Sequence, residues 1–246
     1  MKKIVALLLL LCLGFTLCGC GADKAAILCV AQGDCAGQAL AAQDGSPSCA
    51  LADSDLAALQ QLDAGACGFA LVTEQGLDAA QTSAVKMDRV TLAAFCILSR
   101  AGAFSQWDRS TRVTVVGEPD GWGAALAEQA LTCALHGAVR YADGEEAIRA
   151  LRSGKTDVVM GLFVPQDEGV DALLRAKKDA RLLSMPEELL SVALPDESME
   201  EYTLTMQEQT AHTYALRGAL VRTADAEEKT AQRVWEAAQR AGLIAE

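Results

Sequence analysis

The residues that most directly indicate chemistry are Leu17-Cys18-Gly19-Cys20, where a cysteine follows a small residue. Two lysines, Lys2 and Lys3, and an uncharged apolar run over 4–17 stand before them. A basic start, a short apolar core and a small residue at the cleavage point are the parts of a secretory signal peptide. The apolar run is shorter than the roughly 20 residues of a membrane-spanning helix. The pattern predicts that residues 1–19 are removed.

The end of this segment matches the bacterial lipobox, in which the cysteine thiol is acylated and becomes the first residue of the mature chain. We expect Cys20 to carry a diacylglyceryl group and an N-terminal acyl chain, the two anchors that stable attachment requires. Cys18 is unsuitable, because Leu17 would then occupy the small-residue position. Residues 20–25 would be a tether that holds the chain to the outer face of the cytoplasmic membrane through lipid alone. The alternative is a plain signal peptide cut nearby, with Cys20 an ordinary thiol.

The other cysteines and the histidines do not form a reactive pattern. No CxxC pair, no Cys/His cluster, no Gly-x-Ser-x-Gly elbow and no Walker loop occurs, and His136 and His212 are the only histidines. We therefore expect no metal, no cofactor and no enzyme activity. Several of the remaining cysteines lie in apolar runs, where cysteine behaves as a small buried hydrophobe. Disulfide pairing among Cys29, Cys35 and Cys49 is the alternative. The six that remain after Cys20 are Cys29, Cys35, Cys49, Cys67, Cys96 and Cys133.

Composition narrows the possible partners. Removal of Lys2 and Lys3 leaves 19 basic against 33 acidic residues, a formal charge of −14. An acidic surface argues against binding to nucleic acid or to anionic lipid head groups. An anionic small ligand stays possible, because a cleft can differ from the average surface.

The elements that must position any site alternate between strands and helices. The predicted helices are 54–64, 122–136, 144–153, 168–178, 186–194 and 224–241, the last with a capping box of Asp225 and Glu228 and a stop at Gly242. Such alternation is typical of parallel sheets covered by helices. The predicted strands are 26–31, 48–51, 68–73, 92–99, 112–117, 138–141, 156–163, 181–184 and 213–221.

An internal repeat supports two similar halves. The segment 54–65, a capped amphipathic helix that stops at Gly65, is followed after two residues by the apolar run 68–72. The segment 143–154 stops at Gly154 and is followed by 157–161 at the same spacing. Any α/β protein contains several such units, so the match is suggestive rather than decisive.

Four stretches resemble the TAXI-type solute receptors of tripartite ATP-independent periplasmic (TRAP) transporters, which are type II periplasmic binding proteins. They are 62–72, 112–119, 144–161 and 181–188, followed by the extended segment 202–221 and the closing helix. The resemblance implies an α/β, two-lobed type II periplasmic-binding-protein fold with two hinge-crossing strands and a shortened first lobe. Lobe 1 would be 26–100 plus 212–246, and lobe 2 would be 101–211.

The departures from this family fall on positions that usually hold the ligand. The glycine-rich segment after the first strand is Gln32-Gly33-Asp34-Cys35-Ala36-Gly37, with the following helix shortened or missing. The Gly-Ser-Gly-Thr turn of lobe 2 is replaced by Asp120-Gly121-Trp122-Gly123, and the Asn expected early in the lobe 1 helix is Ala58.

Ligands of open α/β sheets bind at the carboxyl ends of strands, so four loops should line an interlobe cleft. Helix N-termini near Ser54 and Gly121 favour a carboxylate, whereas Asp120 and Glu74 fit a ligand ammonium, so an amino acid suits the site. Trp122 either stacks on the ligand or packs within its lobe, and Arg100 is a candidate carboxylate clamp. The full set of candidate ligand-binding residues is Gly33, Asp34, Ser54, Asp55, Thr73, Glu74, Gln75, Arg100, Asp120, Gly121, Trp122 and Gly123.

The resemblance therefore implies an extracellular or periplasmic lipoprotein that captures a small carboxylate, an amino acid or 2-oxo acid, and presents it to a TRAP-type membrane permease. The alternative is a degenerate relative that keeps the scaffold and serves as a protein-interaction module. The altered turns and the shortened first lobe motivate this second hypothesis.

Overall fold

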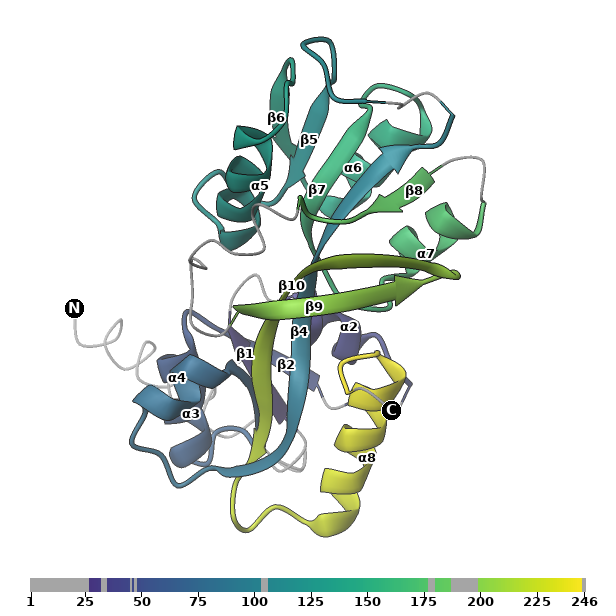
Figure 1. The fold of residues 1–246 in the computed structure, drawn as a ribbon. Coiled ribbons are helices and arrows are strands. Elements are labelled where there is room, and N and C mark those ends of the chain that lie inside the picture. Colours follow the sequence, from purple (N-terminus) through teal and green to yellow (C-terminus); the bar gives the residue numbers. More distant parts are fainter. Residues whose placement is uncertain are drawn as a thin grey trace, which may run out of the picture.

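The computed structural model describes residues 27–31, 35–44, 46, 48–102, 106–176, 180–186 and 199–244. Strands and helices alternate along most of this length, as the sequence predicts (Figure 1). The helices are α2 (Cys35–Ala41), α3 (Asp55–Asp63), α4 (Glu74–Ala79), α5 (Trp122–Thr132), α6 (Gly144–Arg152), α7 (Glu168–Arg175) and α8 (Glu228–Arg240). The strands are β1 (Ile27–Ala31), β2 (Ser48–Ala52), β3 (Phe69–Thr73), β4 (Val85–Arg100), β5 (Val113–Val116), β6 (Val139–Ala142), β7 (Val158–Phe163), β8 (Ala180–Leu183), β9 (Met199–Met206) and β10 (Gln209–Arg222).

All of these strands join one sheet, which is parallel at both ends and antiparallel in the middle. The order is β2-β1-β3-β10-β4-β7-β5-β6, with β8 paired to β4 and β9 paired to β10. The strands β2, β1 and β3 are mutually parallel, as are β7, β5 and β6. The two long strands β4 and β10 run from one parallel unit into the other (Figure 1).

The fold therefore consists of two lobes joined by two crossing strands, and the expected two-lobed α/β architecture is confirmed. Lobe 1 contains β1 to β3 with α2, α3, α4 and α8, and lobe 2 contains β5 to β8 with α5, α6 and α7 (Figure 1).

The repeated sequence segment forms the same unit in each lobe. Ser54 caps α3 by accepting a hydrogen bond from the Ala57 amide at 3.2 Å, and Asp143 caps α6 by accepting one from the Glu146 amide at 2.7 Å. Gly65 and Gly154 end these helices at φ +68° and +71°, a left-handed conformation that glycine adopts without strain. Each glycine leads into a buried strand, β3 or β7.

Helices cover both faces of the sheet, so the core lies in layers on either side of it. Small and aliphatic side chains make up most of this core, as the alanine-rich composition requires. On one face, α2 and α8 pack in lobe 1 and α5 packs in lobe 2. On the other face, α3 covers lobe 1, and α6 and α7 cover lobe 2.

Several predicted elements differ from the structure. The strand β9 was not predicted, because its pattern is broken by Glu200 and Glu201 and its strand conformation depends on pairing with β10. The predicted capping box of Asp225 and Glu228 is wrong: α8 begins at Glu228 after the N-cap Glu227, which makes no side-chain capping bond. Gly242 does end the helix, at φ +72°. Most of the predicted helix 186–194 lies outside the described residues.

The cysteine side chains of the described residues lie mainly in apolar or backbone surroundings. The Cys35 thiol lies 3.8 Å from the Leu92 carbonyl oxygen, and the Cys49 thiol lies 3.4 Å from the Gly37 carbonyl oxygen. Burial raises the pKa of the Cys96 thiol far above its ordinary value, whereas Cys133 is exposed. Within the described part of the chain, no helix is long and apolar enough to cross a membrane.

Candidate functional site

The parallel strands of the two lobes end at the same part of the crossing strands. The last residue of β3, Thr73, pairs with Gly218 of β10, and the last residue of β7, Phe163, pairs with Ala94 of β4. Gly218 in turn pairs with Val90, so the two endpoints are four residues apart along β4, or about 13 Å at the usual rise of a strand. The loops after the strands of both lobes therefore flank the crossing strands, where an interlobe ligand site is expected.

The rim of lobe 1 is formed by the loops after β2 and β3. Ser54 and Thr73 are the N-cap residues of α3 and α4, and the Thr73 hydroxyl accepts a hydrogen bond from the Gly76 amide at 2.9 Å. The same hydroxyl donates to the Asp55 carboxylate at 2.5 Å. Asp55 thus holds the starts of the two helices together, whereas Asp53 is exposed beside it.

Glu74 lies at this rim but is already paired with cations. Its carboxylate is 3.1 Å from Lys86 Nζ and 2.8 Å from Arg89 Nη2. Burial raises the pKa of Glu74, but hydrogen bonds from Arg89 and Lys86 outweigh this effect, and the pKa lies below its ordinary value. Gln75 follows in the first turn of α4 and is exposed. Glu74 is therefore less suited to bind a ligand ammonium than the sequence suggested.

The rim of lobe 2 is formed by the turn between β5 and α5. Gly117 adopts φ +105°, and the Gly121 amide donates to the Glu118 carbonyl oxygen at 3.1 Å, which closes the turn. Gly121 is the N-cap residue of α5 and makes no side-chain capping bond, so the first turn presents backbone N–H groups. A Cβ on Gly123 would lie 3.3 Å from the Val116 carbonyl oxygen, so a small residue is needed where α5 meets the sheet.

An acidic and an aromatic side chain are exposed at this turn. Asp120 is exposed, and Trp122 is 38% exposed, so the indole is packed only in part within lobe 2. Asp143 lies at the end of the neighbouring strand β6, where it caps α6. Sequence reasoning did not select Asp143, although it occupies the position in the second repeat that Ser54 occupies in the first.

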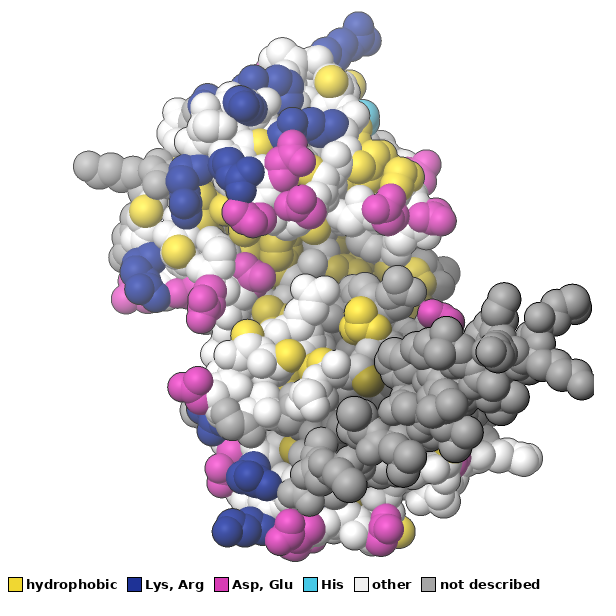
Figure 2. All heavy atoms as spheres, turned by 180° about the vertical axis from the view of Figure 1, so that it is seen from behind, with side chains coloured by type: hydrophobic (Ala, Val, Ile, Leu, Met, Phe, Trp, Pro, Cys, Tyr) yellow, Lys and Arg dark blue, Asp and Glu magenta, His cyan; other side chains and the backbone are white. Residues whose placement is uncertain are grey.

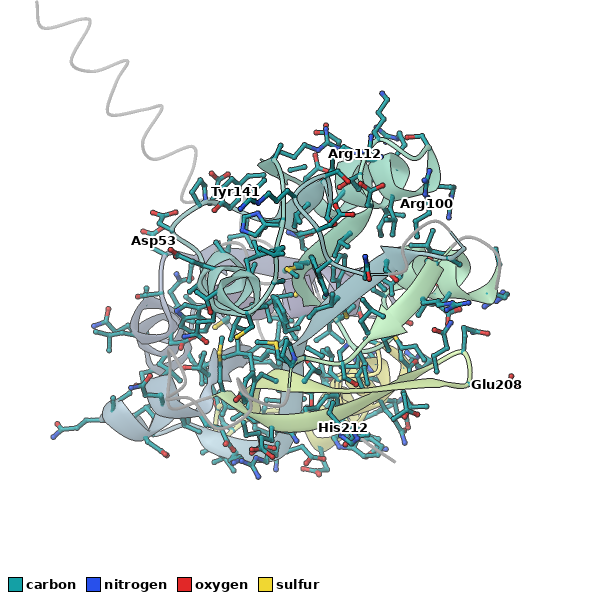
Figure 3. The ribbon with its side chains drawn as sticks, turned by 45° about the horizontal axis from the view of Figure 1, so that its top comes forward. Asp53, Arg100, Arg112, Tyr141, Glu208 and His212 are labelled. Atoms are coloured by element: carbon teal, nitrogen blue, oxygen red, sulfur yellow. The ribbon has the colours of Figure 1, made fainter. Side chains whose placement is uncertain are left out.

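Arg100, the candidate carboxylate clamp, lies away from this rim. Its amide donates to the Asp157 carbonyl oxygen at 3.0 Å, next to the start of β7 and thus at the opposite end of lobe 2. The Arg100 and Arg112 guanidinium groups both lie against Gly154. Figure 3 labels both arginines in lobe 2. Arg100 is the last residue of β4 and lies six residues beyond Ala94, which pairs with the end of β7, so the strand carries its side chain past the rim. Basic side chains gather at this far end of lobe 2 (Figure 2).

Three predicted positions lie outside the described residues: Gly33, Asp34 and the lipidation site Cys20. In the part of the chain that is described, no group of three or more His, Cys, Asp or Glu side chains could hold a metal ion. An apolar cavity of about 70 Å³ between α5 and the strands β4, β7 and β8 is too small for an amino acid, since ligand pockets usually measure about 300 Å³ or more.

The rims combine two kinds of recognition. The open N-terminus of α5 favours an anionic group through its N–H groups and dipole. Asp53, Glu118 and Asp120 are exposed acids, and the loops 53–55, 73–75 and 118–123 contain no lysine or arginine. A ligand with one carboxylate and one ammonium group fits this arrangement better than a dianion does.

Two parallel units that face each other across two crossing strands define a two-lobed fold of the periplasmic-binding-protein type. No protein-family model matches the sequence, and no curated protein is significantly similar to it.

Solved structures are similar in fold. A structure of Vibrio fischeri DarR, of the LTTR family, in complex with DNA aligns with a TM-score of 0.51 and 11% identity over 96% of this chain and 75% of that chain. The apo regulatory domain of HypT from Salmonella typhimurium aligns with a TM-score of 0.48 and 9% identity over 87% and 93% of the two chains. The periplasmic aliphatic sulphonate binding protein SsuA from Escherichia coli aligns at 0.42 and 15% over 89% and 69%. The likeness to DarR supports the shared fold and, at this identity, nothing finer.

Proposed function

We propose that the chain is an extracytoplasmic solute-binding lipoprotein that captures a small amino acid between its lobes and presents it to a membrane permease. The observation that carries this proposal is the convergence of the parallel strand ends of both lobes on the same stretch of β4 and β10. The loops that carry the exposed acids Asp53 and Asp120 flank these two strands, which can act as a hinge. A lipid on Cys20 would keep this two-lobed body at the membrane without restricting the hinge.

The expected ligand is an amino acid rather than a 2-oxo acid. The open first turn of α5 would receive the carboxylate. Asp120 and Asp53 would receive the ammonium group, because both carboxylates are exposed and Glu74 and Asp55 are already paired. A 2-oxo acid lacks the ammonium group and would meet uncompensated acids at both rims.

Closure of the lobes would bend the crossing strands where their pairing is irregular. The register of β10 against β4 shifts between Leu216 and Arg217, next to the pairs that mark the strand ends. A bulge at this position permits a change of angle without loss of the pairing on either side. The TRAP-type permease as the recipient of the ligand is proposed from the sequence resemblance.

A thermal-unfolding screen, in which tryptophan fluorescence reports the unfolding, tests the proposal. The purified full chain in detergent would be heated with each amino acid and with matching 2-oxo acids at millimolar concentration. A ligand at one hundred times its Kd stabilises by about 2.7 kcal/mol, and we expect at least one amino acid to raise Tm by several degrees. The Asp120→Asn variant should lose this response. If no carboxylate shifts Tm, the solute-binding proposal is wrong.

One observation favours the second candidate, a protein-interaction module. Leu51 and Leu56 of lobe 1 are 61% and 56% exposed, close to the rim residue Asp53 in sequence. A patch of exposed apolar side chains rimmed by polar residues marks a protein-interaction surface. The experiment is to cross-link the chain to a membrane permease through this rim and to purify the two together. If the ligand screen fails and Leu56→Ser abolishes this co-purification, the interaction module becomes the better description.

A further inference from the structure

The two crossing strands carry a connected group of ion pairs, here called the hinge cluster, which consists of Glu74, Lys86, Arg89, Glu200 and Arg217. Glu74 pairs with Lys86 at 3.1 Å and with Arg89 at 2.8 Å. Arg89 Nη2 also lies 3.3 Å from Glu200 Oε2. The other oxygen of Glu200 accepts a hydrogen bond from Arg217 Nε at 2.5 Å. Glu200 therefore bridges two arginines on two different crossing strands.

Glu200 reaches this cluster from the β9–β10 hairpin, which is fixed to lobe 2. Leu204 and Met206 of β9 are buried in the core beneath α6 and α7. At the hairpin tip, the Gln207 side-chain amide donates to the Asp171 carboxylate of α7 at 2.6 Å. The Gln209 side-chain oxygen accepts from the Leu182 amide of β8 at 2.9 Å. Core packing and two tip bonds thus hold the hairpin on lobe 2. Figure 1 shows the tip of the hairpin beside α7.

The turn of this hairpin is itself strongly constrained. Gln207 and Glu208 adopt φ +47° and +63°, a left-handed conformation in two consecutive residues that are not glycine. Two-residue turns of this kind match the twist of a hairpin, but side chains other than Gly, Asn and Asp adopt them reluctantly. The tip contacts of Gln207 hold the turn in this conformation. The hairpin is therefore a stiff element that moves with lobe 2.

The other members of the cluster belong to lobe 1 or to the hinge itself. Glu74 is the first residue of α4 and directly follows the rim residue Thr73. Lys86 and Arg89 lie on the half of β4 that pairs with β10 in lobe 1. Arg217 stands at the register shift, donates to the Thr91 hydroxyl, and lies 5.2 Å from the centre of the Tyr202 ring. Within the described residues, Glu200–Arg89 is the only ion pair of the cluster that joins the base of the hairpin to lobe 1.

We propose that Glu200 is an interlobe latch: by bridging Arg89 and Arg217 it couples the angle between the lobes to the ion pairs of the lobe 1 rim. A hinge motion moves the base of β9 relative to Arg89, so the Glu200–Arg89 pair exists only over part of the angular range. The pair stabilises the ligand-free protein at that angle and positions α4 and its cap Thr73. Arg89 and Glu200 are 54% and 39% exposed, so salt weakens the latch. The latch deepens the proposed function, because it controls the hinge on which solute capture depends.

Hydrogen exchange of the full chain in detergent, without any ligand, tests the latch. The Glu200→Gln variant removes the charge and keeps the shape. We expect amides in the peptides 85–94 and 213–220 to exchange about two- to fivefold faster, as for the loss of one partly exposed ion pair. The matched control is Glu201→Gln, which changes the next residue on the opposite, exposed face of β9 and should exchange as the wild type does.

Salt provides a second measurement that needs no variant. Raising sodium chloride from low to molar concentration should accelerate exchange in the same two peptides more in the wild type than in Glu200→Gln, which keeps only the pairs of Glu74 with Lys86 and Arg89. Any one of three results would overturn the latch. They are equal exchange in Glu200→Gln and wild type, equal acceleration in both glutamate variants, and a wild type whose exchange does not respond to salt. Since no ligand is present, a failed solute screen leaves these outcomes intact, and the two proposals can fail separately.

Discussion

Gly218 lies where the crossing strand β10 meets the end of β3, and its replacement by alanine tests the packing of the hinge. A Cβ at this position would lie 2.6 Å from the Leu92 side chain and 2.6 Å from the Val72 carbonyl oxygen. Leu92 can rotate, but the Val72 oxygen belongs to the backbone of β3, so the strands must separate. Overpacking of this kind costs about 1–3 kcal/mol. The lower flexibility of alanine in the unfolded chain returns about 0.4–1 kcal/mol.

The expected net effect of Gly218→Ala is a loss of about 1–2 kcal/mol, which is about 2–8 °C in Tm for a chain of this size. Urea unfolding monitored by circular dichroism would measure the change in the free energy of unfolding. Tryptophan fluorescence on heating would measure the change in Tm.

A second glycine provides the control for this prediction. A Cβ on Gly144, the first residue of α6, would lie 3.6 Å from Phe163 Cε1 and 3.8 Å from Val116 Cγ1, both ordinary contacts. Gly144→Ala should therefore stabilise the protein by about 0.4–1 kcal/mol. If Gly218→Ala is as stable as Gly144→Ala, the close approach of β10 to β3 is wrong, and with it the register that places the strand ends together.

Three further predictions address the repeat, an ion pair and the anchor. Gly65→Ala and Gly154→Ala should each lose about 1–2 kcal/mol of stability in urea unfolding, because both positions have positive φ. The new methyl group at position 154 would also displace the end of the Arg100 side chain, which is flexible, so the two losses should be similar. A hydrogen bond from Arg112 lowers the pKa of Asp157, so the pair stabilises the fold above the unfolded pKa and is lost as pH falls through the folded pKa. Arg112→Gln should therefore lose less than about 1 kcal/mol near neutral pH, since the pair is partly exposed, and this loss should shrink as pH falls through the folded pKa of Asp157, as urea unfolding at successive acidic pH values would show. Cys20→Ser should abolish palmitate labelling and release the protein from the membrane fraction, and retained label would disprove lipidation at Cys20.

Periodicity and spacing in the sequence were sufficient for most of the fold. Buried strands such as β3 and β7 are recognisable as apolar runs, and their helices as capped amphipathic segments that end at glycine. These signals are local, because a cap, a helical stripe and a glycine stop act within a few residues of each other. The order of most strands and helices followed from these signals, whereas the two-lobed arrangement was expected from the resemblance to type II periplasmic binding proteins.

The candidate site was only partly predictable. Ser54, Thr73 and Gly121 follow from the rule that loops after parallel strands form the site, and they are the N-cap residues of α3, α4 and α5. The state of Glu74 and the position of Arg100 did not follow, since both depend on β4. That strand brings Lys86 and Arg89 to Glu74 and carries Arg100 to the far end of lobe 2.

The sequence alone determined most of the elements of this protein, its repeat and the predicted lipid anchor, because these depend on residues that are close together in the chain. Tertiary structure alone decided which charges remain available to a ligand and how the lobes are coupled. Glu200 and Arg89 are 111 residues apart in sequence and 3.3 Å apart in space. No pattern within either segment indicates that contact, because it exists only after β9 pairs with β10 and β10 pairs with β4.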